Sequence, residues 1–541
     1  MSSSGGNTSG QGSTGGRGGA GRNGQGSSGA SAGGRGKGGP RDTSRRNAKG
    51  RERNRGPQRS FTEQAPSQRT RRADPARLVA FEVLRAVAEE DAYANLVLPA
   101  RIRHHHLDKR DAGFATELSY GALRSQGTYD AILARCVDRP LSQLDPAVLD
   151  ALRIGVHQLL AMRVPAHAAL DQTVGLARAV IGAGPSALIN AVLRKVSART
   201  LEEWLDLLVE GETDQTKIAA LRFAHPEWIV RAMRQSLVAH GRPAGEINDL
   251  LEADNAAPVV NLVALPGLGS LDEALDNGAT PGELVEGSAL SSGGDLGRMA
   301  SVRAGTIRVQ DVGSQLVARA LAAVDLGPAS ERTGADAEAS GAGEAWLDLC
   351  AGPGGKAALL GALAHQRGAT LLANEPAPHR AKLVSQALSA VPGGSWQVRT
   401  GDGRDVGAEQ PEGFDRVLAD VPCTGLGALR RRPESRWRRS PKDIADLGPL
   451  QRELLGSALA AVRPGGVVAY VTCSPHPAET TAVVADVLRK RDDLELIDAG
   501  AALDAVSLTG SLGAGHESTA QLWPHIHHTD AMFLALIKKK S

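Results

Sequence analysis

The stretch GGVVAYVTCSP, residues 465–475, decides the fold of the second half of this chain. It is an apolar run that stops at a polar loop containing Cys473, and the run ADVPCTG, residues 419–425, stops in the same way at Cys423. Short apolar runs bounded by turn residues are typical of strands buried in a parallel sheet. Ligands of such sheets bind at the carboxyl ends of the strands, so two thiols at neighbouring ends predict chemistry on a bound group.

Strand-like and helix-like segments alternate on both sides of these two runs. The alternation predicts a doubly wound, Rossmann-like α/β domain over residues 309–541. Residues 326–344 are poor in apolar side chains and are interpreted as a low-complexity surface insertion. The predicted strands are residues 346–350, 370–374, 396–400, 416–420, 467–472, 494–497 and 532–537.

The part of the chain before this domain has a different pattern. Apolar residues three and four positions apart recur between residues 76 and 197, which predicts an all-α bundle over residues 74–200. Residues 201–308 mix helical segments with an apolar run at 258–265, and we interpret them as a small α/β subdomain. The protein is therefore predicted to be multidomain.

Positive charge is concentrated in residues 1–72, which contain 15 Lys or Arg and 3 Asp or Glu. This segment has a net charge of +12, and because the whole chain carries +2, the remainder carries −10. A Gly-, Ser- and Arg-rich segment with few apolar side chains cannot bury enough surface to offset its ordering entropy, so it is predicted to be disordered. A basic tail favours RNA as a partner, and a solubilising tail without a specific role is the alternative.

The four cysteines in 541 residues include no CxxC pair, so they indicate reduced thiols rather than a disulfide framework or a zinc site. Three adjacent histidines, residues 104–106, cannot all face one ion and are interpreted as a solvated loop. No run of 18 apolar residues and no signal-peptide core is present. We expect a cytoplasmic monomer without metal and without a membrane partner.

A glycine-rich turn follows the first predicted strand of the α/β domain in AWLDLCAGPGGK, residues 345–356. Glycines let the backbone approach a ligand closely, and the N-terminus of the next helix favours a polar or anionic group. The spacing is neither G-x-G-x-x-G nor the Walker pattern, because Ala357 follows Lys356, so a dinucleotide or ATP is disfavoured. Glu375 ends the second strand, where a carboxylate would bind ribose hydroxyls, and Asp402 follows the third, where it would meet a base amino group. Together these features indicate S-adenosylmethionine.

The two cysteines suit methylation at C5 of a pyrimidine. C5 is unreactive until a nucleophile adds at C6, and a thiolate is a strong nucleophile. A second group must then remove the C5 proton, so two thiols at adjacent strand ends suit the two tasks. Asp420, three residues before Cys423, is placed to hold the cytosine edge and to stabilise charge at N3. The alternative is that both cysteines are buried packing residues, which is common for this residue type.

A strongly basic segment, LRRRPESRWRRSPK at residues 429–442, follows the Cys423 loop. Arg side chains clamp phosphates and stack on bases, and Trp offers a stacking face. These properties predict an RNA-binding channel beside the thiols, with a solvated basic loop as the alternative. The predicted RNA-binding residues are Arg430, Arg431, Arg432, Arg436 and Trp437.

Residues 222–541 carry, in order, the motifs DLCAGPGGK, GDGR, DVPCTGLG, RRRPE-x-RW and YVTCS. With these motifs the segment resembles the RsmB/NOP/Sun family of RNA cytosine-C5 methyltransferases, and most of all the bacterial members that act on 16S rRNA. Residues 74–200 resemble the NusB-like domain that precedes some RNA methyltransferases, through ELSYGALR, LRIGVHQLL and ALINAVLRK. That fold implies contact with RNA. Gly352 and Val421 stand where the family usually has alanine, and neither change removes a reactive group.

The resemblance also implies a role for each site residue. The cysteine of the TCS motif is the family's nucleophile, which corresponds to Cys473, and the cysteine of the PC motif assists proton removal and product release, which corresponds to Cys423. DNA cytosine methyltransferases use the PC cysteine as nucleophile and lack TCS, so the pairing argues against them. The implied S-adenosylmethionine-binding residues are Cys350, Ala351, Gly352, Pro353, Gly354, Gly355, Lys356, Glu375, Asp402 and Asp420.

We therefore expect an S-adenosylmethionine-dependent enzyme that forms 5-methylcytosine in 16S rRNA through a covalent adduct between Cys473 and cytosine C6. One alternative is a related enzyme that acts on tRNA, which the NusB-like domain disfavours. Another is an RNA-binding assembly or antitermination factor with a vestigial methyltransferase fold. The intact glycine loop and the two thiols count against that second alternative.

Overall fold

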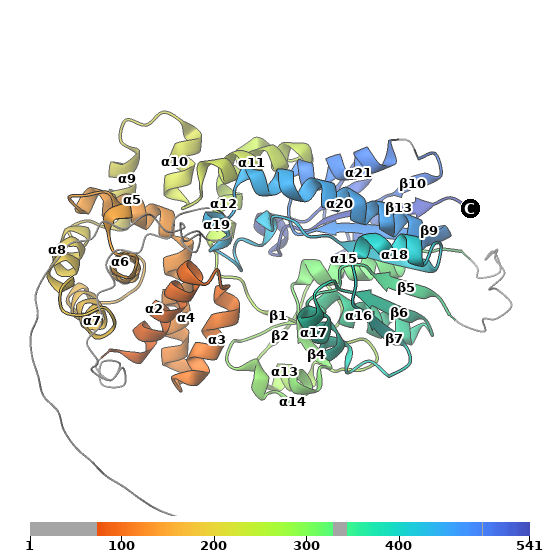
Figure 1. Cartoon of the computed structure of the whole chain (residues 1–541), viewed down its shortest axis with the longest axis horizontal. Helices are drawn as coiled ribbons and strands as arrows, with labels where there is room; N and C mark the ends of the chain where they lie inside the picture. The colour runs from red at the N-terminus through yellow and green to blue at the C-terminus, as the bar shows by residue number, and fades with distance from the viewer. Residues whose placement is uncertain (1–72, 328–342, 490) are drawn as a thin grey trace, which may run out of the picture. The chain divides into compact units, whose positions relative to one another are not determined.

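The computed structural model describes residues 73–327, 343–489 and 491–541 (Figure 1). The predicted basic tail, residues 1–72, lies outside these described residues. Most of the predicted insertion at 326–344 lies outside them as well.

Helices α2 to α8 form the predicted helical bundle and share one apolar core. Asp74 caps α2 by accepting a hydrogen bond from the N–H of Arg77, and Asp145 caps α6 by accepting from Ala147. Such a cap satisfies an N–H group that the first helical turn leaves free. The sequence pattern does not predict α3, because Pro99 lies inside it. The bounds are α2 (Pro75–Glu89), α3 (Ala94–His104), α4 (Lys109–Arg124), α5 (Gln126–Cys136), α6 (Pro146–Leu160), α7 (Ala166–Val180) and α8 (Ser186–Val196).

Helices α9 to α14 and a small antiparallel sheet of order β2-β3-β1-β4 come next in the described chain. Helices α11 and α12 pack against Leu426 and Trp523 of the α/β domain, whereas the small sheet has a core of its own. The predicted strand at 258–265 is β1, and the strand signals between 288 and 307 correspond to β3 and β4. The bounds are α9 (Leu201–Val209), α10 (Gln215–Arg222), α11 (Glu227–Ala239), α12 (Ile247–Asn255), β1 (Asn261–Ala264), α13 (Asp272–Asp276), β2 (Thr280–Pro281), β3 (Ser288–Leu290), α14 (Ala300–Ala304) and β4 (Ile307–Val309).

The α/β domain is built on a 9-stranded sheet of main order β11-β12-β13-β9-β8-β5-β6-β7, with β10 paired to β13. Strands β9, β8, β5, β6 and β7 are parallel neighbours, as predicted, and β13 runs antiparallel to β9. Each predicted strand is present, and the short strands β11 and β12 are additional. The bounds are β5 (Ala345–Asp348), β6 (Thr370–Asn374), β7 (Trp396–Arg399), β8 (Phe414–Asp420), β9 (Val462–Thr472), β10 (Leu494–Ile497), β11 (Gly515–His516), β12 (Thr519–Gln521) and β13 (Phe533–Lys539).

Helices cover both faces of this sheet (Figure 1). On β9, Val467, Ala469 and Val471 pack with α15, α16 and α17, whereas Val468 and Tyr470 pack with α18, α20 and α21. Successive residues of a strand face opposite sides of the sheet, so a strand that is buried on both faces appears in the sequence as one apolar run. The helix bounds are α15 (Val312–Ala323), α16 (Gly355–Gln366), α17 (Pro378–Leu388), α18 (Gly403–Glu409), α19 (Ser435–Arg438), α20 (Pro441–Ala461), α21 (Thr481–Leu488), α22 (Ala499–Asp504) and α23 (Pro524–His527).

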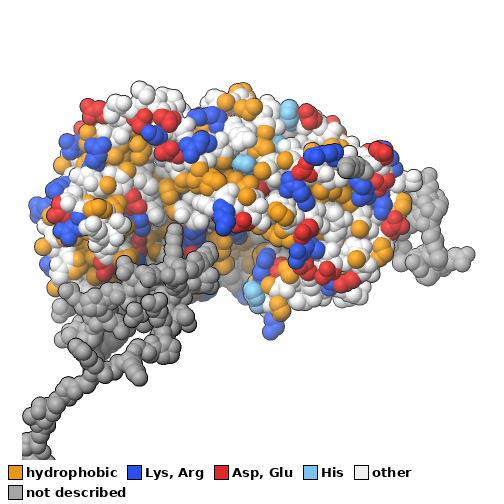
Figure 2. All heavy atoms as spheres, turned by 45° about the horizontal axis from the view of Figure 1, so that its top comes forward, with side chains coloured by type: hydrophobic (Ala, Val, Ile, Leu, Met, Phe, Trp, Pro, Cys, Tyr) orange, Lys and Arg blue, Asp and Glu red, His pale blue; other side chains and the backbone are white. Residues whose placement is uncertain are grey.

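The surface of the described residues shows mixed charge. On the face drawn in Figure 2, Lys and Arg side chains are interspersed with Asp and Glu rather than gathered in one patch. No helix among the described residues is long and apolar enough to cross a membrane. Within the same residues, no three His, Cys, Asp or Glu side chains lie close enough together to hold a metal ion.

Candidate active site

The carboxyl ends of β8 and β9 bring the two predicted thiols together. Asp420 and Val471 are paired in register, so the loops that follow leave the sheet side by side. The Sγ of Cys423 lies 3.4 Å from the Sγ of Cys473. The loop after β8 contacts the loop after β9 at Gly427, whose N–H donates to the carbonyl of Cys473 at 2.9 Å. A Cβ at position 427 would lie 2.3 Å from the carbonyl oxygen of Ala531 and 2.8 Å from that of Cys473, so the packing here requires glycine.

The pKa values of the two thiols are shifted in opposite directions. The hydrogen bond with Cys423 lowers the pKa of Cys473, and the cations Lys356 and Arg432 lower it further, against burial and the charge of Asp420. The same hydrogen bond, together with burial, raises the pKa of Cys423 well above its ordinary value. The arrangement favours Cys473 as the thiolate and Cys423 as the thiol that donates to it.

Lys356, at the end of the glycine loop, extends its side chain toward the thiol pair and Asp420. Its Nζ donates to Oδ2 of Asp420 at 2.9 Å. Burial acts to lower the pKa of Lys356, but the charge and hydrogen bond of Asp420 outweigh it and raise the pKa, so the amine is cationic. The structure thus gathers Asp420, Lys356 and both thiols in one site.

Glu479, which the sequence analysis did not single out, lies beneath both thiol loops. Its side chain is buried, and the carboxylate accepts hydrogen bonds from the N–H of Thr424 at 2.8 Å and from the hydroxyl of Ser474 at 2.6 Å. These two residues directly follow Cys423 and Cys473. A carboxylate in a short, proline-containing turn is ordinarily expected to be exposed, so the sequence does not indicate that Glu479 is buried.

The loop between β5 and α16 has a shape that requires glycine at position 354. Gly354 has a φ of 107°, and a Cβ there would lie 2.4 Å from the Cβ of Ala387. A Cβ on Gly352 would lie 2.1 Å from Oε2 of Glu375. Glycine at position 352, where the resemblance leads one to expect alanine, therefore leaves room for the Glu375 carboxylate against the loop.

The two predicted cofactor carboxylates follow the next two strands of the sheet. Glu375, after β6, is buried and accepts a hydrogen bond from the N–H of Ala377 at 3.0 Å. Asp402, after β7, caps α18, and its hydrogen bonds with Arg404 lower its pKa. The glycine loop, Glu375 and Asp402 thus follow the neighbouring strands β5, β6 and β7, in the order in which the sequence presents them.

Asp348, the last residue of β5, provides a test of whether these residues fit S-adenosylmethionine. It is 1% exposed, and neither carboxylate oxygen has a hydrogen-bond partner among the described residues. Burial, followed by the charge of Asp420, raises the pKa of Asp348 to about 7. An unpartnered buried carboxylate is costly unless a ligand brings a donor or a positive charge. S-adenosylmethionine carries an ammonium group, ribose hydroxyls and a sulfonium, so the site fits this cofactor.

Cys350 lies in the same part of the site and is partly buried. Burial, followed by the charge of Asp348 and of two further carboxylates, raises the pKa of Cys350 well above its ordinary value. Cys350 is therefore a neutral thiol within the glycine loop and does not act as a third nucleophile.

The basic segment at residues 429–442 requires the main correction. Arg436 is 0% exposed, and its guanidinium donates to the carbonyl of Arg124 at 3.2 Å and to that of Asp254 at 2.7 Å. Trp437 donates through Nε1 to the carbonyl of Leu123 at 3.1 Å. These bonds attach α19 to helices α4 and α12, so the donors of both side chains are directed into the protein.

Arg430 and Arg431 are also held within the protein. Their Nε atoms lie 3.0 and 2.9 Å from Oδ1 of Asp530, and both guanidinium groups pair with Asp311. Of the five predicted RNA-binding residues, Arg432 is exposed, with its guanidinium 5.1 Å from the centre of the Tyr93 ring. The open channel predicted from the sequence is therefore wrong for Arg430 and Arg436, which are buried. Arg431 and Trp437 are partly exposed, and their donors are held by protein acceptors.

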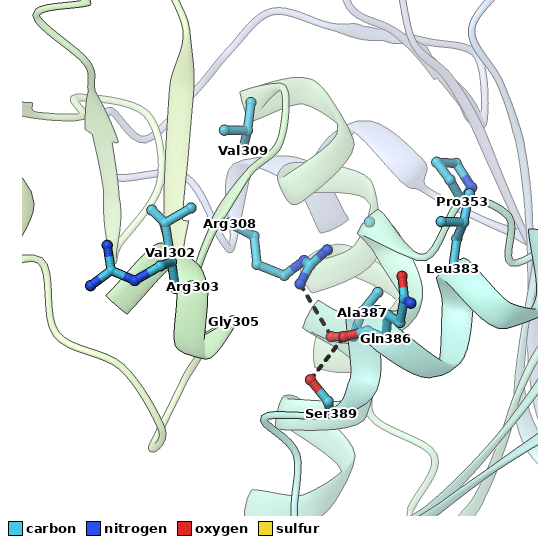
Figure 3. Close-up of a pocket in the computed structure, with 11 residues that line it drawn as sticks. Val302, Arg303, Gly305, Arg308, Val309, Pro353, Leu383, Gln386, Ala387 and Ser389 are labelled. Carbon is cyan, nitrogen blue, oxygen red and sulfur yellow. Dashed lines mark hydrogen bonds between the residues drawn. The ribbon is translucent and has the colours of Figure 1, made fainter. Parts of the chain in front are cut away.

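A groove of about 430 Å³ borders the glycine loop (Figure 3). Figure 3 shows Arg308 reaching from the small sheet toward α17, where it donates to the carbonyl of Ala387 at 3.3 Å, while Arg303 points away from α17. Pro353 lines the groove, whereas neither thiol does. The groove therefore neighbours the cofactor loop without reaching the reactive pair.

Comparisons with known proteins agree with this architecture. Residues 339–538 match the family model of the 16S rRNA methyltransferase RsmB/F, and residues 74–198 match that of the NusB family. Rv1407 of Mycobacterium tuberculosis, a methyltransferase by name, is 46% identical over 483 residues, which cover 88% of this chain and 100% of that protein. The probable ribosomal RNA small subunit methyltransferase B of Synechocystis sp. is 30% identical over 477 residues, 86% of this chain and 99% of that protein.

Among solved structures, the crystal structure of PH0851 superposes with a TM-score of 0.68 at 21% identity, over 86% of this chain and 99% of that one. At this identity the likeness concerns the fold. The helical bundle, the sheet and the glycine loop are those of an S-adenosylmethionine-dependent RNA methyltransferase. The chain belongs to the RsmB/F family of 16S rRNA methyltransferases.

Proposed function

We propose that this protein forms 5-methylcytosine in 16S rRNA through a covalent adduct between the Sγ of Cys473 and C6 of the target cytosine. The relatives named for the small ribosomal subunit support the substrate. The opposite pKa shifts of two thiols 3.4 Å apart are the observation that carries the chemistry.

The reaction begins at the thiolate of Cys473. Its electron pair forms the S–C6 bond, and the C5=C6 electrons move toward C5, which becomes nucleophilic. S-adenosylmethionine, when bound, supplies the electrophilic methyl group that C5 takes up. Asp420, at the end of β8, is assigned to hold the edge of the cytosine, and the Lys356 cation that donates to its carboxylate offsets the negative charge that the addition creates.

Resolution of the adduct requires a second group. The proton at C5 must leave, its electron pair must re-form the C5=C6 bond, and the Cys473 thiolate must depart from C6. Cys423 is assigned to this stage, because its Sγ lies beside that of Cys473. Once Cys473 is bonded to C6, the Cys423 thiol gives its own proton to solvent, and the resulting thiolate takes the proton from C5.

The decisive experiment measures transfer of a tritiated methyl group from S-adenosylmethionine to unmodified 16S rRNA, with tRNA in parallel. Label that is recovered as 5-methylcytidine from 16S rRNA is the expected result. Label in tRNA alone would keep the chemistry and overturn the substrate. Cofactor binding without label in free rRNA, in small-subunit particles or in tRNA would favour the alternative of an RNA-binding assembly factor.

A further inference from the structure

The carboxylate of Glu479 connects two loops that follow different strands. Its Oε1 accepts a hydrogen bond from the N–H of Thr424 at 2.8 Å, and its Oε2 accepts from the hydroxyls of Thr424 and Ser474 at 2.5 and 2.6 Å. The two hydroxyls also lie 3.3 Å from each other. Each donor belongs to the residue that directly follows a thiol, so a single carboxylate holds both loops.

Glu479 is itself fixed from two further directions. Gln451 of α20 donates to the carboxylate at 3.2 Å and also to the carbonyl of Pro422 at 2.9 Å, and Pro422 directly precedes Cys423. The hydroxyl of Tyr470 donates to the carbonyl of Glu479 at 2.8 Å. A fully buried carboxylate is stable only when donors surround it, so these contacts specify one arrangement of the two loops.

We propose that Glu479 is a positioning residue of the thiol pair, whose carboxylate sets the 3.4 Å separation at which Cys423 donates to Cys473. Among the described residues, its carboxylate accepts from the residues that follow the two thiols and from Gln451, and from neither sulfur atom. The inference rests on the proposed function for the choice of Cys473 as nucleophile. The state of the thiols can nevertheless be measured without RNA.

The negative charge of Glu479 has a second effect on the pair. The pKa of Cys423 is raised first by its hydrogen bond with Cys473, then by burial, and then by the charges of Cys473, Glu479 and Asp420. The pKa of Cys473 is lowered chiefly by the bond with Cys423. Loss of Glu479 therefore acts on Cys473 through that bond. The groups that face Cys473 are Cys423, Asp420, Lys356 and Arg432.

The test uses Glu479→Gln, which keeps the size of the side chain but replaces one acceptor oxygen with an amide and removes the charge. Alkylation of each thiol by iodoacetamide is followed against pH by peptide mass spectrometry, on the full chain without RNA. We expect the alkylation midpoint of Cys473 to rise and that of Cys423 to fall, each by on the order of one pH unit. The two midpoints then converge.

Two further variants separate positioning from general loss of structure. Glu434→Gln removes another buried carboxylate, which accepts from the N–H of Ala94 at 3.1 Å and takes no part in the thiol loops, so it should leave both midpoints unchanged. Glu479→Asp keeps the charge on a shorter side chain. It should raise the midpoint of Cys473 and lower that of Cys423, the latter by less than in Glu479→Gln, because the charge that raises the pKa of Cys423 is kept.

Each outcome decides a specific point. Wild-type midpoints in a folded Glu479→Gln protein would overturn the inference. If that variant does not fold, Glu479→Asp decides, and wild-type midpoints there would overturn it equally. If the two midpoints of the wild-type protein do not differ, the choice of Cys473 as nucleophile fails, which is a failure of the proposed function rather than of the Glu479 contacts.

Discussion

Cys423 and Cys473 stand 50 residues apart in the chain, and their Sγ atoms lie 3.4 Å apart in the structure. Two thiols this close cannot behave independently, because a charge on one changes the proton affinity of the other. The two thiols therefore titrate as a unit, and the opposite shifts of their pKa values favour Cys473 as the sulfur that loses its proton first.

Replacement of the proposed nucleophile should abolish the reaction. We expect Cys473→Ala to lower methyl transfer to RNA by about 10³-fold or more, because the variant loses the thiolate that adds to C6. Equilibrium binding of labelled S-adenosylmethionine should be unchanged in this variant. Transfer at the wild-type rate would contradict the assignment.

Replacement of the second thiol should instead stop the reaction after methyl transfer. We expect Cys423→Ala to accumulate a protein–RNA adduct that survives denaturing electrophoresis, and to lower turnover by about 10²- to 10⁴-fold. The double variant Cys423→Ala/Cys473→Ala is the control and should form no adduct. Normal turnover in Cys423→Ala would exclude its role in release.

The buried Asp348 predicts how the stability of the cofactor-free protein depends on pH. In the unfolded chain an Asp titrates near pH 3.9, whereas in the folded protein the pKa of Asp348 is raised to about 7. Between about pH 3.9 and pH 7 the folded state therefore holds a proton on Asp348 that the unfolded state does not. The stability contributed by this group is present at low pH and is lost as the pH rises through about 7. Asp348→Asn should remove the loss and raise the free energy of unfolding at pH 8 by about 1–3 kcal/mol.

Urea unfolding of the wild-type protein and of Asp348→Asn at pH 5 and pH 8 checks this prediction. The two proteins should differ much more at pH 8 than at pH 5. An equal difference at both values would mean that Asp348 is not protonated in the folded state. Saturating S-adenosylmethionine should reduce the advantage of the variant, because the ligand stabilises the folded wild-type protein.

The buried Arg436 predicts a structural role for the basic segment. Arg436→Met should lower the free energy of unfolding by about 2–4 kcal/mol, because it leaves the carbonyls of Arg124 and Asp254 without this donor. Arg432→Met, on an exposed side chain of the same segment, should change it by less than about 0.5 kcal/mol. Equal unfolding curves for the two variants would contradict the assignment.

Arg432 remains the candidate for direct RNA contact in this segment. Its guanidinium is exposed and its charge acts on Cys473, so it lies where the target strand must approach. We expect Arg432→Gln to weaken RNA binding at low salt and to reduce the slope of log affinity against log salt by about 0.7. An unchanged slope would leave this segment without a phosphate contact.

Local patterns predicted most of the fold because the interactions that make the elements are themselves local. The β9 run is apolar at every position because both faces of the strand are covered, and Asp74 and Asp145 mark helix starts that depend only on neighbouring residues. The strands β11 and β12 escaped prediction because they are two and three residues long. Strands of that length have no measurable period.

Site residues could be predicted from the sequence where their role follows from residue type and position at a strand end. They could not be predicted where their burial or hydrogen bonding depends on partners far away in the chain. Both thiols, Asp420 and the glycine loop were found from their positions at strand ends. Arg436 was misread because its acceptors lie 312 and 182 residues away in the chain. Glu479 was missed because its burial depends on the way two separate loops meet over it.

The attachment of α19 has a consequence for how such proteins diversify. The segment that carries Arg436 and Trp437 begins a few residues after Cys423, and both side chains bond to backbone carbonyls of the helical parts. A gene fusion that exchanged the helical bundle for an unrelated module would remove the carbonyl of Leu123, which accepts from the indole N–H of Trp437, and the carbonyl of Arg124, one of the acceptors of Arg436. Any module that replaced the bundle would therefore have to supply these two acceptors as well as its own contacts with RNA.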